Sequence, residues 1–226
     1  MRHAKDFLTE NEQQELRDAI KQAEQGTSGE VVPVIAVSSG RYDRAEDIVG
    51  LIMGCTLLSI VWALFQGVNA LPGDWGPDYE FRINLPLVVG LFLFGFAGGG
   101  LAATFHPPLC KIFIRKREIE EEVRRRAAEA FYRFGIANTI GKTGVLIYIS
   151  LFERRVVVLG DKVVAEKISE GEWKSICADI SDGIKDGKAF SGIKKAIIDC
   201  GTLLKKHLPA ADSDLNQLKD EIHFVD

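Results

Sequence analysis

The sequence predicts a small α/β sandwich that is interrupted by a two-helix transmembrane hairpin. Two uncharged apolar runs, at residues 48–65 and 83–105, are each long enough to cross a bilayer as a helix. On both sides of them lies more polar sequence, in which helix-like and strand-like patterns follow one another. The order helix, strand, hairpin, helix, two strands and further helices is typical of a small sheet between helical layers.

The first part of the polar sequence predicts a helix followed by a strand. Thr9 and Glu12 have the spacing of a capping box and an apolar stripe follows them, so we expect an amphipathic helix from Thr9 to about Gln25. Residues 30–38 are rich in β-branched and other apolar side chains, which indicates a buried strand. Because Pro33 has no N–H, we expect this strand to lie at a sheet edge or to carry a bulge there.

The two apolar runs predict a pair of packed membrane-spanning helices. At about 1.5 Å per residue they are roughly 27 and 34 Å long, close to a hydrocarbon core of about 30 Å. Gly50 with Gly54, and Gly95 with Gly99, form faces without side chains on which helix backbones approach closely. We expect these faces to pack the two spans together, and a homodimer through the same faces is the alternative. Neither run contains Asp, Glu, Lys or Arg, which argues against a transport pathway.

The distribution of basic residues predicts the orientation of the hairpin. The connection at residues 66–82 holds a single basic residue, Arg82, whereas several flank the outer ends of the two spans. The positive-inside rule therefore places both termini in the cytoplasm, as an integral membrane protein with two spans. The basic residues that follow the second span are also expected to contact anionic lipid, and they are Lys111, Arg115, Lys116 and Arg117.

The second polar part predicts a long helix, a β-hairpin and a helical end. Residues 109–134 are dense in both charges and read as one solvated helix. The apolar runs 145–151 and 155–159 are separated by a tight turn and indicate two paired strands. From Pro209 onward the chain is acidic, and we expect a loosely held tail. The helical patterns between the strands and the tail are 163–168, 172–184 and 191–207.

Composition excludes some classes of function. The formal net charge of −4 argues against a nucleic-acid-binding protein, which carries a basic excess or stripe. The four cysteines and four histidines are scattered along the chain, so no zinc site is predicted. The segment GIANTIGKT at residues 135–143 has one residue too many for a phosphate-binding P-loop, and it precedes a strand instead of following one.

Two positions are candidates for ligand contact. Ser38, Ser39 and Arg41 lie where a strand ends and a helix begins, and free N–H groups with the helix dipole favour an anion there. An ordinary Ser/Gly turn with an exposed arginine is the alternative. Asp161 follows another strand and precedes another helix, so it is either the N-cap of that helix or a carboxylate available to a metal ion.

Outside the hairpin the chain resembles the TPM domain family. Three segments carry the resemblance, and they are FLTENEQQELRDAIKQAEQGTSGEVVPVIAVSS, FYRFGIANTIGKTGVLIYISLFERRVVVLGDK and DGKAFSGIKKAIID. The terminal NQLKDEIHFVD is similar to the endings of membrane-bound members. The resemblance implies a small α/β/α sandwich. It also implies a function among those of the family, which include photosystem maintenance, receptor association, weak acid phosphatase activity and calcium binding.

The chain departs from the family pattern where metal binding is implied. The family has Asp-Asn-Gly before the second strand, and this chain has Lys142-Thr143-Gly144. A cation at that place repels calcium by on the order of 1 to 4 kcal/mol at about 4 Å, so no cofactor is expected and Lys142 becomes a candidate anion contact. The family's Gly-x-Gly after the third strand is Gly160-Asp161-Lys162 here.

These observations predict three parts and two alternative functions. The parts are a TPM-like domain made of residues 1–47 and 106–209, a transmembrane hairpin at 48–105 and a tail at 210–226. The first function is a membrane-anchored interaction or quality-control module on the cytoplasmic face, with the bilayer and other membrane proteins as partners. The alternative is a weak acid phosphatase that hydrolyses phosphomonoesters.

Overall fold

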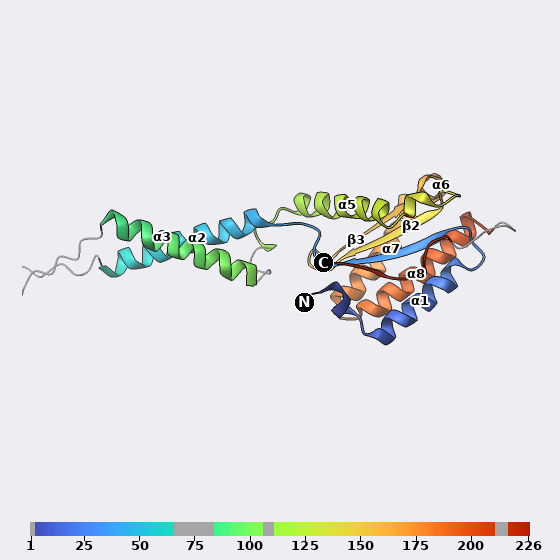
Figure 1. Ribbon diagram of the computed structural model, residues 1–226, viewed down its shortest axis with the longest axis horizontal. Helices are drawn as coiled ribbons and strands as arrows, with labels where there is room; N and C mark the ends of the chain where they lie inside the picture. Colours follow the sequence, from blue (N-terminus) through green and yellow to red (C-terminus); the bar gives the residue numbers. More distant parts are fainter. Residues whose placement is uncertain (1–2, 66–83, 106–110, 211–216) are drawn as a thin grey trace, which may run out of the picture. The chain divides into compact units, whose positions relative to one another are not determined.

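The computed structural model describes residues 3–65, 84–105, 111–210 and 217–226 (Figure 1). The chain divides into two compact units. Residues 1–40 and 117–226 form the first, which we call the sheet unit, and residues 41–116 form the second, the hairpin unit. The polypeptide therefore leaves the sheet unit after one strand and returns to it 76 residues later.

The sheet unit is built on four strands in the order β3-β2-β1-β4. β1 (Glu30–Ala36) runs parallel to β2 (Gly144–Ser150) and to β4 (His223–Val225), while β3 (Arg155–Gly160) is antiparallel to β2. Every residue of β1 and β2 is buried, in agreement with their continuous apolar sequences. β3 is half-exposed, as expected for an edge strand.

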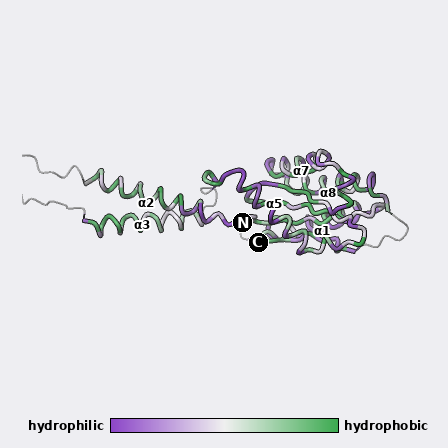
Figure 2. Tube along the Cα trace, turned by 90° about the horizontal axis from the view of Figure 1, so that it is seen from above, coloured by the Kyte–Doolittle hydropathy of each residue, from purple (hydrophilic) through white to green (hydrophobic). Residues whose placement is uncertain are grey.

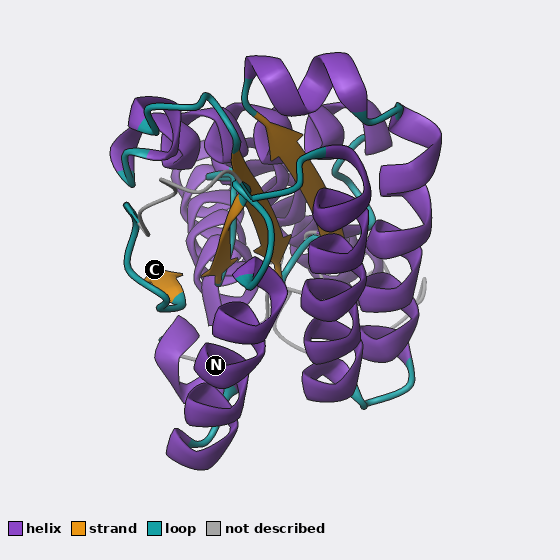
Figure 3. Ribbon diagram, turned by 90° about the vertical axis from the view of Figure 1, so that its right-hand side faces the viewer, coloured by secondary structure: helices purple, strands orange, loops and turns teal. Residues whose placement is uncertain are grey.

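Three helices cover one face of this sheet, and one helix covers the other (Figures 1 and 3). α1 (Glu10–Glu24), α7 (Glu170–Lys185) and α8 (Ala189–His207) lie on the first face, with α8 in contact with both of the others. α5 (Lys116–Arg133) lies on the opposite face, and the short α6 (Lys162–Lys167) follows β3. The α/β/α sandwich expected from the sequence is therefore present.

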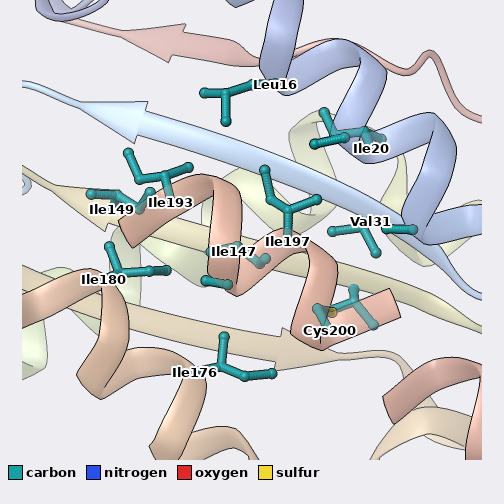
Figure 4. Close-up of a cluster of buried hydrophobic side chains, with 14 of the residues drawn as sticks. Leu16, Ile20, Val31, Ile147, Ile149, Ile176, Ile180, Ile193, Ile197 and Cys200 are labelled. Atoms are coloured by element: carbon teal, nitrogen blue, oxygen red, sulfur yellow. The ribbon is translucent and has the colours of Figure 1, made fainter. Parts of the chain in front are cut away.

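The main core lies between the sheet and the three-helix layer (Figure 4). Leu16 and Ile20 of α1 belong to this core together with Ile147 and Ile149 of β2. α1 and α8 approach so closely that a Cβ on Gly201 would stand 2.5 Å from the Cα of Ala23. The buried apolar side chains of both helices thus face the sheet. The remaining large side chains of this core that Figure 4 labels are Ile176, Ile180, Ile193 and Ile197.

The helix ends follow local chemistry that was readable in the sequence. The Thr9 hydroxyl accepts the Glu12 N–H, and the Glu12 carboxylate accepts the Thr9 N–H, so the predicted capping box of α1 is confirmed. A second capping box, between Ser169 and Glu172, starts α7 two residues before the predicted helix. α5 begins at Lys116, later than predicted. Residues 112–115 are not helical, and the predicted start near Leu109 lies outside the described residues.

The expectation that Pro33 marks an edge or a bulge was wrong, because β1 is an interior strand in regular register. The reason is local. Successive backbone N–H groups of a strand point alternately to its two neighbours. The N–H of Glu30 points toward β2 and the N–H of Val37 points toward β4. The nitrogen of Pro33, which is four residues before Val37, therefore also points toward β4. β4 pairs only with Val34, Ile35 and Ala36. Pro33 therefore lies just beyond the reach of β4, where no ladder hydrogen bond is lost.

The last residues belong to the sheet and do not form a loose tail over residues 217–226. β4 adds to β1, and the Asp226 side chain accepts the Ala4 N–H at 2.6 Å and contacts His3 Nδ1 at 2.9 Å. The short 3-10 helix at Ala4–Phe7 contacts β4. The two ends of the sequence are thus held together at the same edge of the sheet.

The hairpin unit consists of two antiparallel apolar helices, α2 (Asp43–Phe65) and α3 (Leu85–Phe105), both coloured as hydrophobic in Figure 2. Both are long and apolar enough to cross a membrane. The two helices pack so tightly that a Cβ on Gly95 would be 2.8 Å from Gly54 Cα, and a Cβ on Gly99 would be 2.8 Å from Gly50 Cα. The structure thus places all four glycines singled out in the sequence at the α2–α3 contact.

Candidate functional site

A buried polar cluster lies where β1 and β2 end, and we call it the Glu153 cluster. It comprises Ser38, Ser39, Tyr148, Ser150 and Glu153. β1 stops at Ala36 and continues as an extended segment, whose carbonyl at Val37 accepts the Phe152 N–H of the β2–β3 turn. Arg154, at a φ of 54°, closes that turn. This geometry points the Glu153 carboxylate into the end of the sheet, where the residue is only 4% exposed.

The Glu153 carboxylate is hydrogen-bonded on both oxygens. Its Oε1 accepts the Ser39 N–H at 2.8 Å, the Gly40 N–H at 3.3 Å and the Ser38 hydroxyl at 3.2 Å. Its Oε2 accepts the Ser150 hydroxyl. A carboxylate that is removed from water in this way is stable only with such a set of donors. The cluster therefore fastens the end of β1 to the β2–β3 turn.

The hydroxyl groups behind Glu153 form a continuous network. Ser39 Oγ lies 2.8 Å from Ser150 Oγ and 3.2 Å from the Tyr148 hydroxyl, and Ser39 is 1% exposed. Burial raises the pKa of Tyr148 above its ordinary value, although the Ser39 hydrogen bond opposes this shift. Arg126 of α5 donates from Nε to the Ser39 carbonyl at 3.1 Å. No hydroxyl of this network faces solvent as an exposed nucleophile would.

The anion site predicted at Ser38 and Ser39 is thus occupied by the Glu153 carboxylate of the same chain. The N–H groups of Ser39 and Gly40, which we expected to bind an external anion, donate to Glu153. The sequence analysis missed Glu153, although its position in a tight turn next to the strand end was visible. A carboxylate three residues after a strand was the available signal, but nothing local indicated that it would turn inward.

The other predicted contact residues each interact with neighbours of their own. Arg41 belongs to the hairpin unit and forms an exposed ion pair with Asp43 at 3.5 Å. Lys142 precedes β2, at the end of the parallel strands opposite to Ser38 and Ser39, and its Nζ donates to the Ala137 carbonyl. Asp161 is the N-cap of α6, since its Oδ1 accepts the Lys162 N–H at 2.7 Å. The structure therefore does not bring Lys142 to the serines.

The sheet unit has a groove on the α5 side of its sheet. It has a volume of about 230 Å³, and we call it the α5–β3 groove. Arg155 pairs with Glu120 across it at 3.3 Å, whereas Arg124 makes no ion pair within the described part of the chain. The groove therefore carries an excess positive charge. It is lined by Glu120, Val123 and Arg124 of α5 and by Arg155, Val156 and Val157 of β3.

A second group of acids holds the C-terminal segment. The Glu30 carboxylate accepts the N–H groups of Gln217 and Leu218 at 2.7 and 2.8 Å. Glu24 accepts the Val31 N–H at 2.8 Å and hydrogen-bonds to Asp220. Burial is the main cause that raises the pKa of Glu24 to about 8, and the neighbouring carboxylates of Asp220 and Glu30 add to it. At neutral pH the Glu24 carboxyl therefore carries the proton that joins it to Asp220.

Comparisons with known proteins agree with this architecture. Residues 112–202, from the approach to α5 into α8, match the family model described as TPM domain. Among solved structures, the NMR structure of BA42 protein from the psychrophilic bacterium Bizionia argentinensis matches with a TM-score of 0.56. The two chains are 20% identical, and the match covers 96% of this chain and 94% of that one, so it shows the fold alone.

No curated protein matches the chain. The matched residues contain two of the three segments on which the resemblance rested, namely FYRFGIANTIGKTGVLIYISLFERRVVVLGDK and DGKAFSGIKKAIID. The remaining strands, β1 and β4, complete the same sheet from outside the matched range. Residues 112–202 of this chain therefore match the TPM domain, and the solved structure shares the fold of the chain.

Proposed function

We propose that this chain is a membrane-tethered binding module, in which the hairpin unit anchors a TPM domain at the cytoplasmic face and the domain binds other proteins, among them components of membrane quality control. The observation that carries the proposal is the apolar surface of α2 and α3. Leu64 and Phe94 are 69% and 75% exposed, and many further large apolar side chains of the two helices face outward. Burying each such side chain is worth roughly 1.5–3 kcal/mol, which favours a bilayer around them.

The polar groups inside the two helices support the same environment. Thr56 Oγ1 donates to the Ile52 carbonyl at 2.7 Å, and Ser59 Oγ donates to the Cys55 carbonyl at 2.8 Å. Both hydroxyls are therefore satisfied by their own helix, as a hydrocarbon environment requires. The glycine contacts between α2 and α3 are also of the kind that packs helices in lipid, where no hydrophobic force drives them together.

The α5–β3 groove is the surface that we assign to binding. Its unpaired Arg124, beside the partly exposed Arg155, fits an acidic side chain of a partner. We therefore expect docking through side chains on the α5 face.

The phosphatase alternative has less support. It needs an anion site with free N–H donors, and those at Ser39 and Gly40 hold Glu153. Lys142, one of the two cations suggested by the sequence, lies at the opposite end of the parallel strands. No observation on the described residues favours this activity over binding.

The tether is tested by alkaline carbonate extraction of membranes from cells that express the full chain. We expect the protein to stay in the membrane pellet and to be released only by detergent. A variant with Leu57 and Leu91 both changed to Asp is the matched comparison, because it places two charges in the spans and should be released. Recovery of the unchanged chain in the carbonate supernatant would contradict the tether.

Binding through the groove is tested by photo-crosslinking. A crosslinking amino acid at Val157, which lines the groove, is compared with one at Lys174, which is exposed on α7. We expect discrete crosslinked bands from Val157 only, and their loss when Arg124 and Arg155 are both changed to Glu. Equal labelling from both positions, or bands that persist in the charge-reversed variant, would reject the groove as the binding surface.

A further inference from the structure

The short segment that follows α3 exposes apolar side chains beside basic ones. Residues 111–116 read KIFIRK and contain three cations and no acid. Ile112 is 82% exposed and Phe113 is 39% exposed, although both are large and apolar. Neither Arg115 nor Lys116 forms an ion pair with a described residue. In water, this segment therefore leaves two large apolar side chains unburied and two of its cations unpaired.

The covalent chain fixes where this segment lies relative to a bilayer that contains α3. α3 has 21 residues, so it is about 31 Å long and crosses the hydrocarbon core once. Lys111 follows the last residue of α3, Phe105, by six positions, and an extended chain of that length spans about 20 Å. The segment is therefore confined to the headgroup region or its immediate surroundings.

The charge of the segment differs from that of the other entry to the hairpin. Residues 41–47, which lead into α2, contain two arginines and three acidic residues. Arg41 there is paired with Asp43, and Glu46 accepts the Thr104 hydroxyl at 3.2 Å. Of these two segments, only residues 111–116 carry a net positive charge. Positive charge without acidic neighbours attracts anionic headgroups, while exposed Ile and Phe enter the acyl boundary.

We propose that residues 111–116 are a docking surface for anionic phospholipid, in which Ile112 and Phe113 insert at the acyl boundary and Arg115 and Lys116 contact the headgroup phosphates. This inference rests on the proposed tether, and it adds a lipid preference that the tether alone does not require. The surface marks the point at which the chain passes from the hairpin unit to α5. Anionic lipid therefore orders residues 111–116, the segment through which the chain returns to the TPM domain.

The test is hydrogen–deuterium exchange of the backbone amides of residues 111–116 in the full chain. The protein is placed in nanodiscs of phosphatidylcholine alone or of phosphatidylcholine with phosphatidylglycerol. We expect slower exchange in the discs that contain phosphatidylglycerol. Changing Arg115 and Lys116 to Gln should remove most of that difference, since each basic residue near the surface contributes about fivefold to binding.

Two further variants make the result specific. K174Q with K188Q removes the same charge from exposed positions of the sheet unit and should keep the lipid-dependent difference. I112S with F113S should speed up exchange in both kinds of disc. Equal exchange of the unchanged protein in the two lipids, or an equal effect of the two charge-removing variants, would overturn the proposal. Failure of the protein to enter either disc would instead refute the tether, and the lipid surface with it.

Discussion

The Glu153 carboxylate accepts the backbone N–H of Ser39 at 2.8 Å, across 114 residues of sequence that include the whole hairpin. One residue lies at the end of the strand that precedes the insertion, and the other lies in the turn of the strand pair that follows it. This contact closes the sheet unit at the place where the chain leaves it toward α2. Within the sheet unit, the end of the segment that follows β1 is therefore held by a buried carboxylate.

Removal of this carboxylate should destabilise the domain. In Glu153→Ala the N–H groups of Ser39 and Gly40 and the Ser150 hydroxyl lose their acceptor inside the protein, and we expect the free energy of unfolding to fall by about 2–4 kcal/mol. Urea denaturation of the detergent-solubilised chain, followed by circular dichroism, measures this loss. Glu153→Gln keeps one acceptor oxygen and should lose less. A change below about 0.5 kcal/mol in the alanine variant would show that the cluster is not structural.

The contact of α1 with α8 predicts a steric effect at Gly201. An added methyl group would stand 2.5 Å from Ala23 Cα, so Gly201→Ala should push the two helices apart and cost about 1–3 kcal/mol of stability. Gly171→Ala in α7 is the matched control. There the new atom meets nothing closer than 3.8 Å, and the higher helix propensity of alanine should leave stability equal or slightly raised. Similar melting temperatures for the two variants would contradict the close packing.

Gly99 and Gly98 of α3 allow a similar comparison in the hairpin, because only Gly99 faces α2 closely. A leucine at Gly99 meets the Cα of Gly50 and the side chain of Met53, whereas a leucine at Gly98 meets open space. We expect Gly99→Leu to widen the separation of α2 and α3 and Gly98→Leu to leave it unchanged. Distances between spin labels on the two helices, measured by electron–electron double resonance in nanodiscs, report the separation. Unchanged distances in both variants would mean that the glycine faces do not set the packing.

The raised pKa of Glu24 predicts that the free energy of unfolding falls as the pH rises. Its pKa is raised to about 8 in the folded protein, so between the ordinary carboxyl pKa near 4.5 and about 8 the folded state holds a proton that the unfolded state has released. Folding is therefore penalised increasingly across that window. Glu24→Gln mimics the protonated acid and can still accept the Val31 N–H.

The variant should consequently be as stable as the unchanged protein near pH 5 and more stable near pH 8, by on the order of 1–4 kcal/mol. Urea denaturation at a series of pH values measures the difference. Exchange of the amides of residues 217–225 should also be slower in the variant at pH 8, because the Asp220 contact is kept. Parallel stability curves for the two proteins across this range would exclude Glu24 as the titrating group.

Much of the fold was readable from local patterns. The capping box at Thr9, the apolar periods of α1 and α8 and the continuous apolar strands β1 and β2 each depend on residues a few positions apart. The two apolar helices followed in the same way from length and composition. The candidate site could not be predicted from local patterns. Ser39 and Glu153 are separated in sequence by the whole hairpin, and they come into contact only in the folded domain.

Pro33 illustrates the difference between local and tertiary information. The sequence determined that Pro33 cannot donate a hydrogen bond to an adjacent strand. It did not determine whether an adjacent strand would lie opposite the Pro33 nitrogen. That depended on β4, whose three residues come from the far end of the chain and stop short of Pro33. An interior strand tolerates the proline because its neighbour on that side is short.

The sequence by itself determined the local periods, the helix caps, the insertion of two apolar helices and the resemblance to TPM domains, since each is carried by neighbouring residues. Only the tertiary structure decided that the N–H groups after β1 bind Glu153, that Lys142 lies at the opposite strand end, and that the C-terminal segment completes the sheet. The physical reason is that hydrogen bonds and buried charges act over a few ångströms in space. Sequence separation therefore carries no information about which distant groups satisfy one another.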